Sequence, residues 1–340
     1  MAEFYFVGGE DSSLNKSGIG SVDTALVAAR RTANARCSLR VGPGSANLDG
    51  WVATWATPRA ELWISARVHR VGNASSLGEH WALLDAVGNR RLSVNNVNSS
   101  GTISRLNKRD SSGTVTLLTE LAFNNYPGTL TKFDLHVIYG GAGVGQIRVF
   151  FDGALVYGYS GDLTTNSAIT GFSGFKFGGS TNTSGASDGT YWSEIIVSDT
   201  DTRSLNLVTL APSANGNAFT FDSGSAASIN ETTLDDSTLI ASATAGQLAQ
   251  FTVNTAGITN TPAVKAVVVT ARAAKGGSGP QNAKMVVRSG GVDSSSATLA
   301  LPAALGHTQA VFATNPNTGA SWTAPEITAA GFNVGIRTEA

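Results

Sequence analysis

The carboxylates of this sequence are not spaced for the sugar hydrolysis that paired acidic residues perform. Glycoside hydrolysis needs two carboxylates held a short distance apart on either side of the scissile bond. Glu194 has no acidic residue two or four positions before it, and a glycine turn separates it from Asp188. We therefore interpret Glu194 as a structural or edge-strand residue, and we predict no catalytic residues and no enzymatic activity.

The histidines and serines form no other catalytic or metal-binding pattern. The four histidines lie far apart and make no His-x-His or His-Glu-x-x-His arrangement: His69, His80, His136 and His307. The stretch Gly277-Ser278-Gly279 is a turn sequence without the strand-to-helix context of a nucleophile elbow. No phosphate-binding loop is present either, so the residues themselves predict no cofactor.

The composition is typical of strands joined by tight turns. Charged residues make up 14% and hydrophobic residues 41% of the 340 residues, and 39 residues are glycine. Glycine, asparagine and aspartate adopt the positive φ angles that hairpin turns require. The 23 basic and 24 acidic residues nearly cancel, so no strong field attracts a nucleic acid. We therefore expect an all-β protein without a nucleic-acid partner.

The single cysteine and the amino end limit the chemistry and the location further. Cys37 has no second cysteine for a disulfide or a zinc site, and it alternates with Leu39 and Val41, which favours an inert core thiol. The first ten residues lack the basic and apolar regions of a signal peptide. No stretch approaches the roughly 18 apolar residues of a membrane span. We expect synthesis in the cytoplasm and no membrane insertion.

A three-strand meander is the clearest local prediction. Residues 146–151 and 154–157 are apolar runs separated by Asp152-Gly153, which is a strong hairpin signal. Residues 132–139 alternate just before them. The other strands predicted in the first half span 61–70, 80–85, 91–95, 114–118, 174–178 and 192–199. Residues 23–34 could form a short helix, but we interpret them as an irregular or mixed segment.

A change in composition predicts two domains. A polar cluster rich in Pro, Gly and Asn follows the last strand of the first half and indicates a linker. We predict a jelly-roll domain over 1–203, a linker over 204–216 and a smaller immunoglobulin-like or fibronectin-like β-sandwich over 217–340. Its predicted strands span 248–253, 264–273, 284–288, 297–301, 309–313 and 332–337.

Two stretches resemble known protein classes. The sequence from Phe133 to Val137, the turn Asp152-Gly153 and the run from Tyr191 to Val197 resemble the closing strands of concanavalin A-like, laminin-G-like jelly rolls. The segments 199–217 and 315–327 are similar to those of tailed-phage virion proteins in which a lectin-like domain precedes a second β-domain.

The resemblance implies a non-enzymatic virion structural protein, either a fibre or spike subunit or a decoration of the capsid or tail. It implies other virion proteins as partners, a homo-oligomer with a trimer as a candidate state, and host cell-surface glycans as a candidate ligand. The alternative function is a carbohydrate-active enzyme, such as a glycoside hydrolase, or a lectin of the same fold. The glucanase branch carries Glu-x-Asp-x-x-Glu on one strand, and this sequence lacks that motif.

The resemblance also implies two kinds of binding site. Sugar sites in such folds use an aromatic platform, for which the candidates are Trp51, Trp55, Tyr191 and Trp192, with core packing as the preferred alternative. Trp63 and Trp81 are predicted to be core residues. Calcium is the one cofactor that the resemblance suggests. Its candidate ligands, on loops that could share a rim of the sandwich, are Asp152, Asp162 and Asp188, although the hairpin turn already accounts for Asp152.

Overall fold

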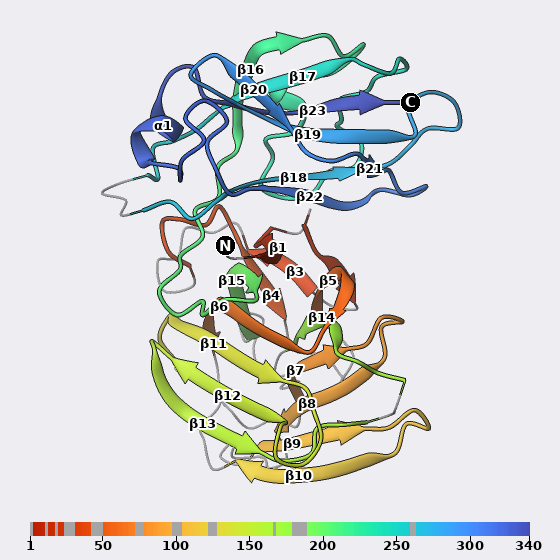
Figure 1. Ribbon diagram of the computed structural model, residues 1–340, viewed down its shortest axis with the longest axis vertical. Coiled ribbons are helices and arrows are strands. Elements are labelled where there is room, and N and C mark those ends of the chain that lie inside the picture. The colour runs from red at the N-terminus through yellow and green to blue at the C-terminus, as the bar shows by residue number, and fades with distance from the viewer. Residues whose placement is uncertain are drawn as a thin grey trace. The chain divides into compact units, whose positions relative to one another are not determined.

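The chain forms two compact units, Ala2–Leu207 and Val208–Ala340. The computed structural model describes residues 3–10, 13–17, 20–23, 31–41, 50–71, 78–96, 104–121, 128–165, 168–178, 189–258 and 263–340. Almost all regular structure in these residues is strand, which confirms the all-β prediction (Figure 1). None of the helices in these ranges is both long and apolar enough to cross a membrane.

The first unit contains an antiparallel eight-stranded sheet. Its strand order is β13-β12-β11-β6-β15-β4-β3, and β1 pairs with β15. The strands are β1 (Phe4–Gly8), β3 (Gly20–Asp23), β4 (Ser38–Val41), β6 (Glu61–Val71), β11 (Thr131–Ile138), β12 (Gln146–Phe151), β13 (Ala154–Ser160) and β15 (Gly189–Ser198). The predicted meander is therefore confirmed as the neighbouring strands β11, β12 and β13, drawn in yellow to green in Figure 1.

A seven-stranded sheet forms the second layer of this unit. Its order is β10-β9-β8-β7-β14-β5-β2. The strands are β2 (Asn15–Ser17), β5 (Gly50–Arg59), β7 (Gly78–Leu84), β8 (Arg90–Asn96), β9 (Ser104–Arg109), β10 (Val115–Leu121) and β14 (Phe172–Phe177). One cluster of buried apolar side chains draws on both sheets, so they pack face to face as the predicted jelly-roll sandwich.

Alternation along each strand produces this core. On β11, for example, Phe133, Leu135 and Val137 are fully buried against the other sheet. The Trp192 ring contacts Phe133 of its own sheet at 5.8 Å and Phe177 of the opposite sheet at 5.1 Å, both edge to face. Burying large apolar side chains of this kind contributes about 2–3 kcal/mol each, so these rings are major contributors to sheet packing.

The Asp-Gly turn has the backbone that its sequence predicts. Asp152 has φ 48° and Gly153 has φ 82°, as the two central residues of a type I′ hairpin require. The Asp152 carboxylate also accepts the Lys132 main-chain N–H at 2.9 Å. The turn thereby bonds to the start of β11.

Trp63 was predicted to be a core residue, and this prediction is wrong. Trp63 lies on the outer face of the eight-stranded sheet. Leu62 and Ile64 face the core, so Trp63 between them faces outward, where it stacks on His136 at 4.2 Å and on Phe150 at 5.7 Å. The Arg203 guanidinium lies over both Phe150 and Trp63. The alternation of the strand, and not the hydrophobicity of the residue, decides which face a tryptophan occupies.

Residues 199–207, here called the closing segment, bond to this outer face. Lys132 Nζ donates to the carbonyls of Thr202 at 2.8 Å and Arg203 at 2.9 Å, and also to that of Leu205. The Thr202 hydroxyl donates to the Asp134 carboxylate at 2.8 Å. These bonds explain how two charged side chains of β11 are buried without destabilising the sheet.

The second unit is a smaller sandwich, as predicted. A six-stranded sheet has the order β16-β17-β23-β19-β20, with β21 also on β19, and β18 pairs with β22. The elements are β16 (Pro212–Phe219), β17 (Leu248–Val253), β18 (Val267–Ala273), β19 (Asn282–Ser289), β20 (Val292–Ser295), β21 (Leu299–Ala300), β22 (Gly306–Phe312), β23 (Asn333–Glu339) and α1 (Ala324–Thr328). Its core contains Trp322, whose indole N–H donates to the Phe312 carbonyl at 2.7 Å.

The predicted linker 204–216 is placed differently in the structure. Residues 204–207 belong to the first unit, and β16 begins at Pro212 as an edge strand on β17. Proline is tolerated at the first residue of an edge strand because its missing N–H is not needed there. Most of the segment 23–34, interpreted as irregular or mixed, lies outside the described residues, and residues 31–34 are not helical.

Candidate functional site

The outer face of the seven-stranded sheet carries polar side chains in two adjacent rows. Leu92, Val94 and Leu106 point into the core, and because strand side chains alternate, their neighbours point outward. The register pairs β8 with β9 so that the outward positions lie side by side. We call the outward residues of these strands the polar strip: Ser93, Asn95, Arg105, Asn107 and Arg109.

Hydrogen bonds connect the side chains in the middle of the polar strip. The Ser93 hydroxyl donates to Asn95 Oδ1 at 2.8 Å, and Asn107 Nδ2 donates to the same oxygen at 3.5 Å. All three side chains are partly exposed. Their amides and hydroxyls therefore stay accessible while their orientations are restricted.

Aliphatic side chains border the polar strip on the edge strand β10. Val115 is 49% exposed and Leu117 is 47% exposed. The register places Val115 opposite Arg109 and Leu117 opposite Asn107. The face thus combines planar polar groups with apolar surface within one strand spacing.

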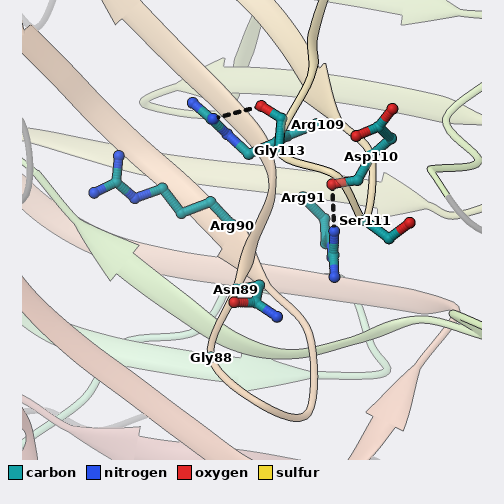
Figure 2. Close-up of a pocket in the computed structure, with 8 residues that line it drawn as sticks. All are labelled: Gly88, Asn89, Arg90, Arg91, Arg109, Asp110, Ser111 and Gly113. Atoms are coloured by element: carbon teal, nitrogen blue, oxygen red, sulfur yellow. Dashed lines mark hydrogen bonds between the residues drawn. The ribbon is translucent and has the colours of Figure 1, made fainter.

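A hollow of about 390 Å³ lies at one end of the polar strip (Figure 2). It is open to solvent and lies between the turn that joins β7 to β8 and the turn that joins β9 to β10. Its lining consists of Gly88, Asn89, Arg90, Arg91, Arg109, Asp110, Ser111 and Gly113.

Both turns beside the hollow have the same sequence pattern, Asp-x-x-Gly-x. In each, the glycine has a positive φ angle, 82° at Gly88 and 88° at Gly113. The aspartate side chain caps the turn: Asp85 accepts the N–H of Asn89 at 2.9 Å, and Asp110 accepts that of Thr114 at 2.9 Å. This repeated pattern was a readable signal for two equivalent hairpins, and the sequence analysis missed it.

Hydrogen bonds keep both turn carboxylates ionised. The Ser112 hydroxyl, helped by main-chain N–H groups, holds the pKa of Asp110 below its usual value. Burial alone would raise the pKa of Asp85, but bonds from the Asn89 main chain and the Arg91 guanidinium lower it below the usual value. Both carboxylates are therefore occupied in holding their own turns.

The three arginines of the hollow differ in how fully they are bonded. Arg91 binds the Asp85 carboxylate at 2.7 Å and the Asp110 carbonyl at 2.7 Å. Arg90 binds the buried carboxylate of Glu79 at 3.1 Å. Arg109 donates to the Gly113 carbonyl at 2.8 Å. Figure 2 shows Arg91 between the two turns and the Arg90 and Arg109 side chains extending away from it.

Glu194 is a second candidate, because its backbone is strained. It has φ 55° in the middle of β15, a conformation that is rare for a residue other than glycine, asparagine or aspartate. It sits where the register with β6 shifts between Ser193 and Ile196. Such bulges re-aim a side chain, and strained residues cluster at functional sites. No sequence pattern announces this conformation, and Glu194 was interpreted as structural because it has no acidic residue two or four positions before it.

The Glu194 carboxyl is buried but not isolated. Its side chain is 3% exposed, with one oxygen accepting the Thr32 hydroxyl and the other 3.7 Å from Arg67 Nε. Burial raises the pKa of Glu194 against the opposing effects of the Thr32 hydrogen bond and the positive charges of Arg67 and Lys132. A buried carboxyl with a raised pKa can hold and release a proton nearer to neutral pH than an exposed one.

The four residues predicted as an aromatic sugar platform all lie in the interior. Trp51 and Trp192 are 2% and 0% exposed, and their indole N–H groups donate to the carbonyls of Arg40 and Gly178. Trp55 likewise donates to a main-chain carbonyl, and Tyr191 is 1% exposed. Their placement matches the core-packing alternative and presents no ring face to a ligand.

The predicted calcium ligands are not brought together in the described part of the chain. Asp152 is in the turn before β13 and Asp162 follows the end of that strand, so the length of β13, about 3.3 Å per residue, separates them. Asp162 instead pairs with Lys108 at 2.8 Å. Asp188 lies outside the described residues, and within those residues no three His, Cys, Asp or Glu side chains form a metal-binding group.

Comparisons with known proteins find likeness in structure but not in sequence. No protein-family model matches the chain, and no curated protein matches it in sequence. Among solved structures, endo-β-1,4-glucuronan lyase from the fungus Trichoderma reesei matches with TM-score 0.42 and 13% identity, over 58% of this chain and 96% of that one.

Two further matches concern carbohydrates. A conserved carbohydrate esterase from the Shiga toxin-encoding bacteriophage phi24B has TM-score 0.36 and 12% identity, over 59% of this chain and all of that one. A carbohydrate-binding module from Bacillus subtilis has TM-score 0.31 and 12% identity, over 54% of this chain and 94% of that one.

These matches overturn the prediction that the protein has no enzymatic activity. That prediction depended on a missing hydrolase motif, whereas the matching solved structures include a lyase and an esterase. One fold supports many reactions, so the missing motif does not exclude an enzymatic activity. The first unit of the chain is a β-sandwich, made by its two face-to-face sheets.

Proposed function

We propose that the first unit binds a carbohydrate along the polar strip and in the adjoining hollow. The observation that carries this proposal is the juxtaposition of Ser93, Asn95 and Asn107 with the exposed aliphatic side chains of Val115 and Leu117. A pyranose presents a ring of hydroxyls around an apolar face, so it needs planar hydrogen-bonding groups beside an apolar surface.

The strip also has the extended form that an oligosaccharide requires. Its outward residues follow two neighbouring strands and end at the hollow between the two capped turns. Because the sheet holds the side chains of Asn95 and Asn107 in contact, little conformational entropy is lost when a ligand bonds to them. A chain of several sugar units would occupy the strip, with one unit in the hollow.

Glycan-array binding followed by titration of the best ligand tests this proposal. Asn107→Ala removes one amide from the strip, and we expect it to weaken binding by about 1 kcal/mol, or roughly fivefold. Gln146→Ala is the matched control, because this amide starts β12 in the other sheet. Equal affinity for the wild type and Asn107→Ala, or no binding to any glycan, would contradict the proposal.

The strained Glu194 favours a second candidate, cleavage of a polysaccharide with this carboxyl as the proton-carrying group. Incubation with a panel of polysaccharides, analysed for shortened products, tests it. Turnover by the wild type that disappears in Glu194→Gln supports the candidate. Turnover that survives this substitution assigns the chemistry to other residues.

We further propose that the carbohydrate-binding unit is carried on a tailed-phage particle as a homo-oligomer. The support is the resemblance to virion proteins and the surface rich in uncharged polar residues. Mass spectrometry of purified particles and light scattering of the purified protein test it. A monomer that never co-purifies with particles would contradict it.

A further inference from the structure

The charges around the hollow do not balance. Arg90 shares the Glu79 carboxylate with Lys176, whose Nζ is 3.1 Å from it. Arg91 forms an ion pair with the Asp85 carboxylate. Among the described residues, four cations, including Arg109, therefore face three carboxylates, including the Asp110 group that is bonded within its own turn.

Arg109 is the cation that is left over. Within the described ranges it has no carboxylate partner, and the Gly113 carbonyl takes one of its donors. A guanidinium has five N–H donors in a planar fork, so most of its donors are available. The carboxylate nearest in sequence, Asp110, points its oxygens at Ser112 and Thr114.

The sheet places a second arginine next to it. Leu92 of β8 pairs with Lys108 of β9, so Arg91 and Arg109 are the next opposed positions on these strands. A bulge in the pairing of β7 with β8 turns Arg90 outward as well. Like charges opposite each other destabilise a sheet. An arrangement of this kind is stabilised when an anion binds between the cations.

We propose that the hollow binds the carboxylate of an acidic sugar, that is, a uronic acid unit of the polysaccharide on the polar strip, with the Arg109 guanidinium as its main partner. The inference depends on the proposed function, because it names the sugar class of the same site. A carboxylate is planar and matches the guanidinium fork with two parallel hydrogen bonds. Asn89 and Ser111, which also line the hollow, supply groups for the neighbouring hydroxyls.

Titration of the full chain with oligomers of polygalacturonate, polyglucuronate and alginate tests the inference. The methyl esters of the same oligomers remove the charge and keep the sugar, and dextran sulfate offers an anion of different geometry. We expect at least one acidic oligomer to bind about 10- to 100-fold more tightly than its ester, the size of a lost charge-assisted pair. Its affinity should fall with rising salt.

Arg109→Ala should lose this preference, and Arg109→Lys should recover only part of it because an ammonium lacks the planar fork. Arg148→Ala, on the outward side of β12 in the other sheet, is the control and should bind as the wild type does. Equal affinity for acid and ester, an unaffected Arg109→Ala variant, or equal binding of dextran sulfate would each overturn the inference.

The outcomes separate this inference from the proposed function. If neutral oligomers bind, Asn107→Ala weakens them and Arg109→Ala does not, the polar strip is a sugar site and the acidic assignment is wrong. If no oligomer of either kind binds, both proposals are wrong.

Discussion

Glu194→Gln is expected to leave the protein at least as stable as the wild type at neutral pH. Glutamine keeps the shape of the side chain and an acceptor for the Thr32 hydroxyl. Arg67 keeps its bond to Asn206 at 3.0 Å and its contact with Asp152 at 4.0 Å. The ion pair that is lost is long, at 3.7 Å, and its loss is offset because the substitution removes the desolvation cost of a buried charge.

The dependence on pH follows from the raised pKa of Glu194. A carboxyl whose pKa is higher in the folded state than in the unfolded state stabilises the fold at pH values below its unfolded-state pKa, about 4.3. This stabilisation is lost as the pH rises through the folded-state pKa. Glutamine imitates the protonated form. The variant should therefore be more stable than the wild type at neutral pH, and this difference in stability should vanish at acidic pH.

Thermal unfolding followed by tryptophan fluorescence measures this effect, because five of the six tryptophans lie in the first unit. A change of about 1 kcal/mol corresponds to roughly 2–4 °C for a domain of this size. Glu120→Gln, which removes an exposed carboxylate from β10, is the control. A loss of about 3–5 kcal/mol at pH 7, typical of a broken buried ion pair, would refute the reasoning and make Glu194 a structural residue.

Three further predictions concern single contacts. Lys132→Met should cost about 3–5 kcal/mol in urea unfolding, because it removes the donor to the carbonyls of the closing segment; a loss under about 1 kcal/mol would show that other contacts hold this segment. The hydrogen bond from Lys108 lowers the pKa of Asp162 to about 2. Asp162→Asn should therefore lower stability at pH 7 by no more than about 1 kcal/mol, and the difference from the wild type should disappear as the pH falls from about 4 toward that value; a difference independent of pH would contradict this. Gly335→Ala would bring a Cβ within 2.2 Å of the Ala249 carbonyl oxygen, so it should destabilise the second unit by about 1–3 kcal/mol in calorimetry, and an unchanged transition would be the contrary result.

Elements with a strong local signal were predicted well. The hairpin at Asp152-Gly153 and the strand β17 over Leu248–Val253 match the structure closely, because turn chemistry and alternation are properties of a few neighbouring residues. Strand β5 was missed although Trp51, Ala53 and Trp55 alternate in it. The polar and proline residues at its end weakened the pattern.

The short helix α1 was also missed, although its start has a readable signal. Thr323 and Glu326 form a capping box, with Thr323 N donating to the glutamate at 2.7 Å, and Pro325 is in the first turn. The interior position of the candidate sugar-platform residues, which matches the preferred alternative of core packing, has a different reason. Whether a tryptophan near a turn faces solvent depends on the opposite sheet, which the local sequence does not describe.

The sequence by itself determined the fold class, the jelly roll followed by a smaller sandwich, most of the strands and the Asp-Gly hairpin, because composition, period and turn residues act locally. Only the tertiary structure decided the chemistry of the surface. The pairing of β8 with β9 brought Asn95 beside Asn107, and the two capped turns brought three arginines around one hollow. The bulge in β15 turned Glu194 into a buried, strained position. Each of these arrangements depends on register between strands distant in sequence, and register is set by the packing of the whole sheet.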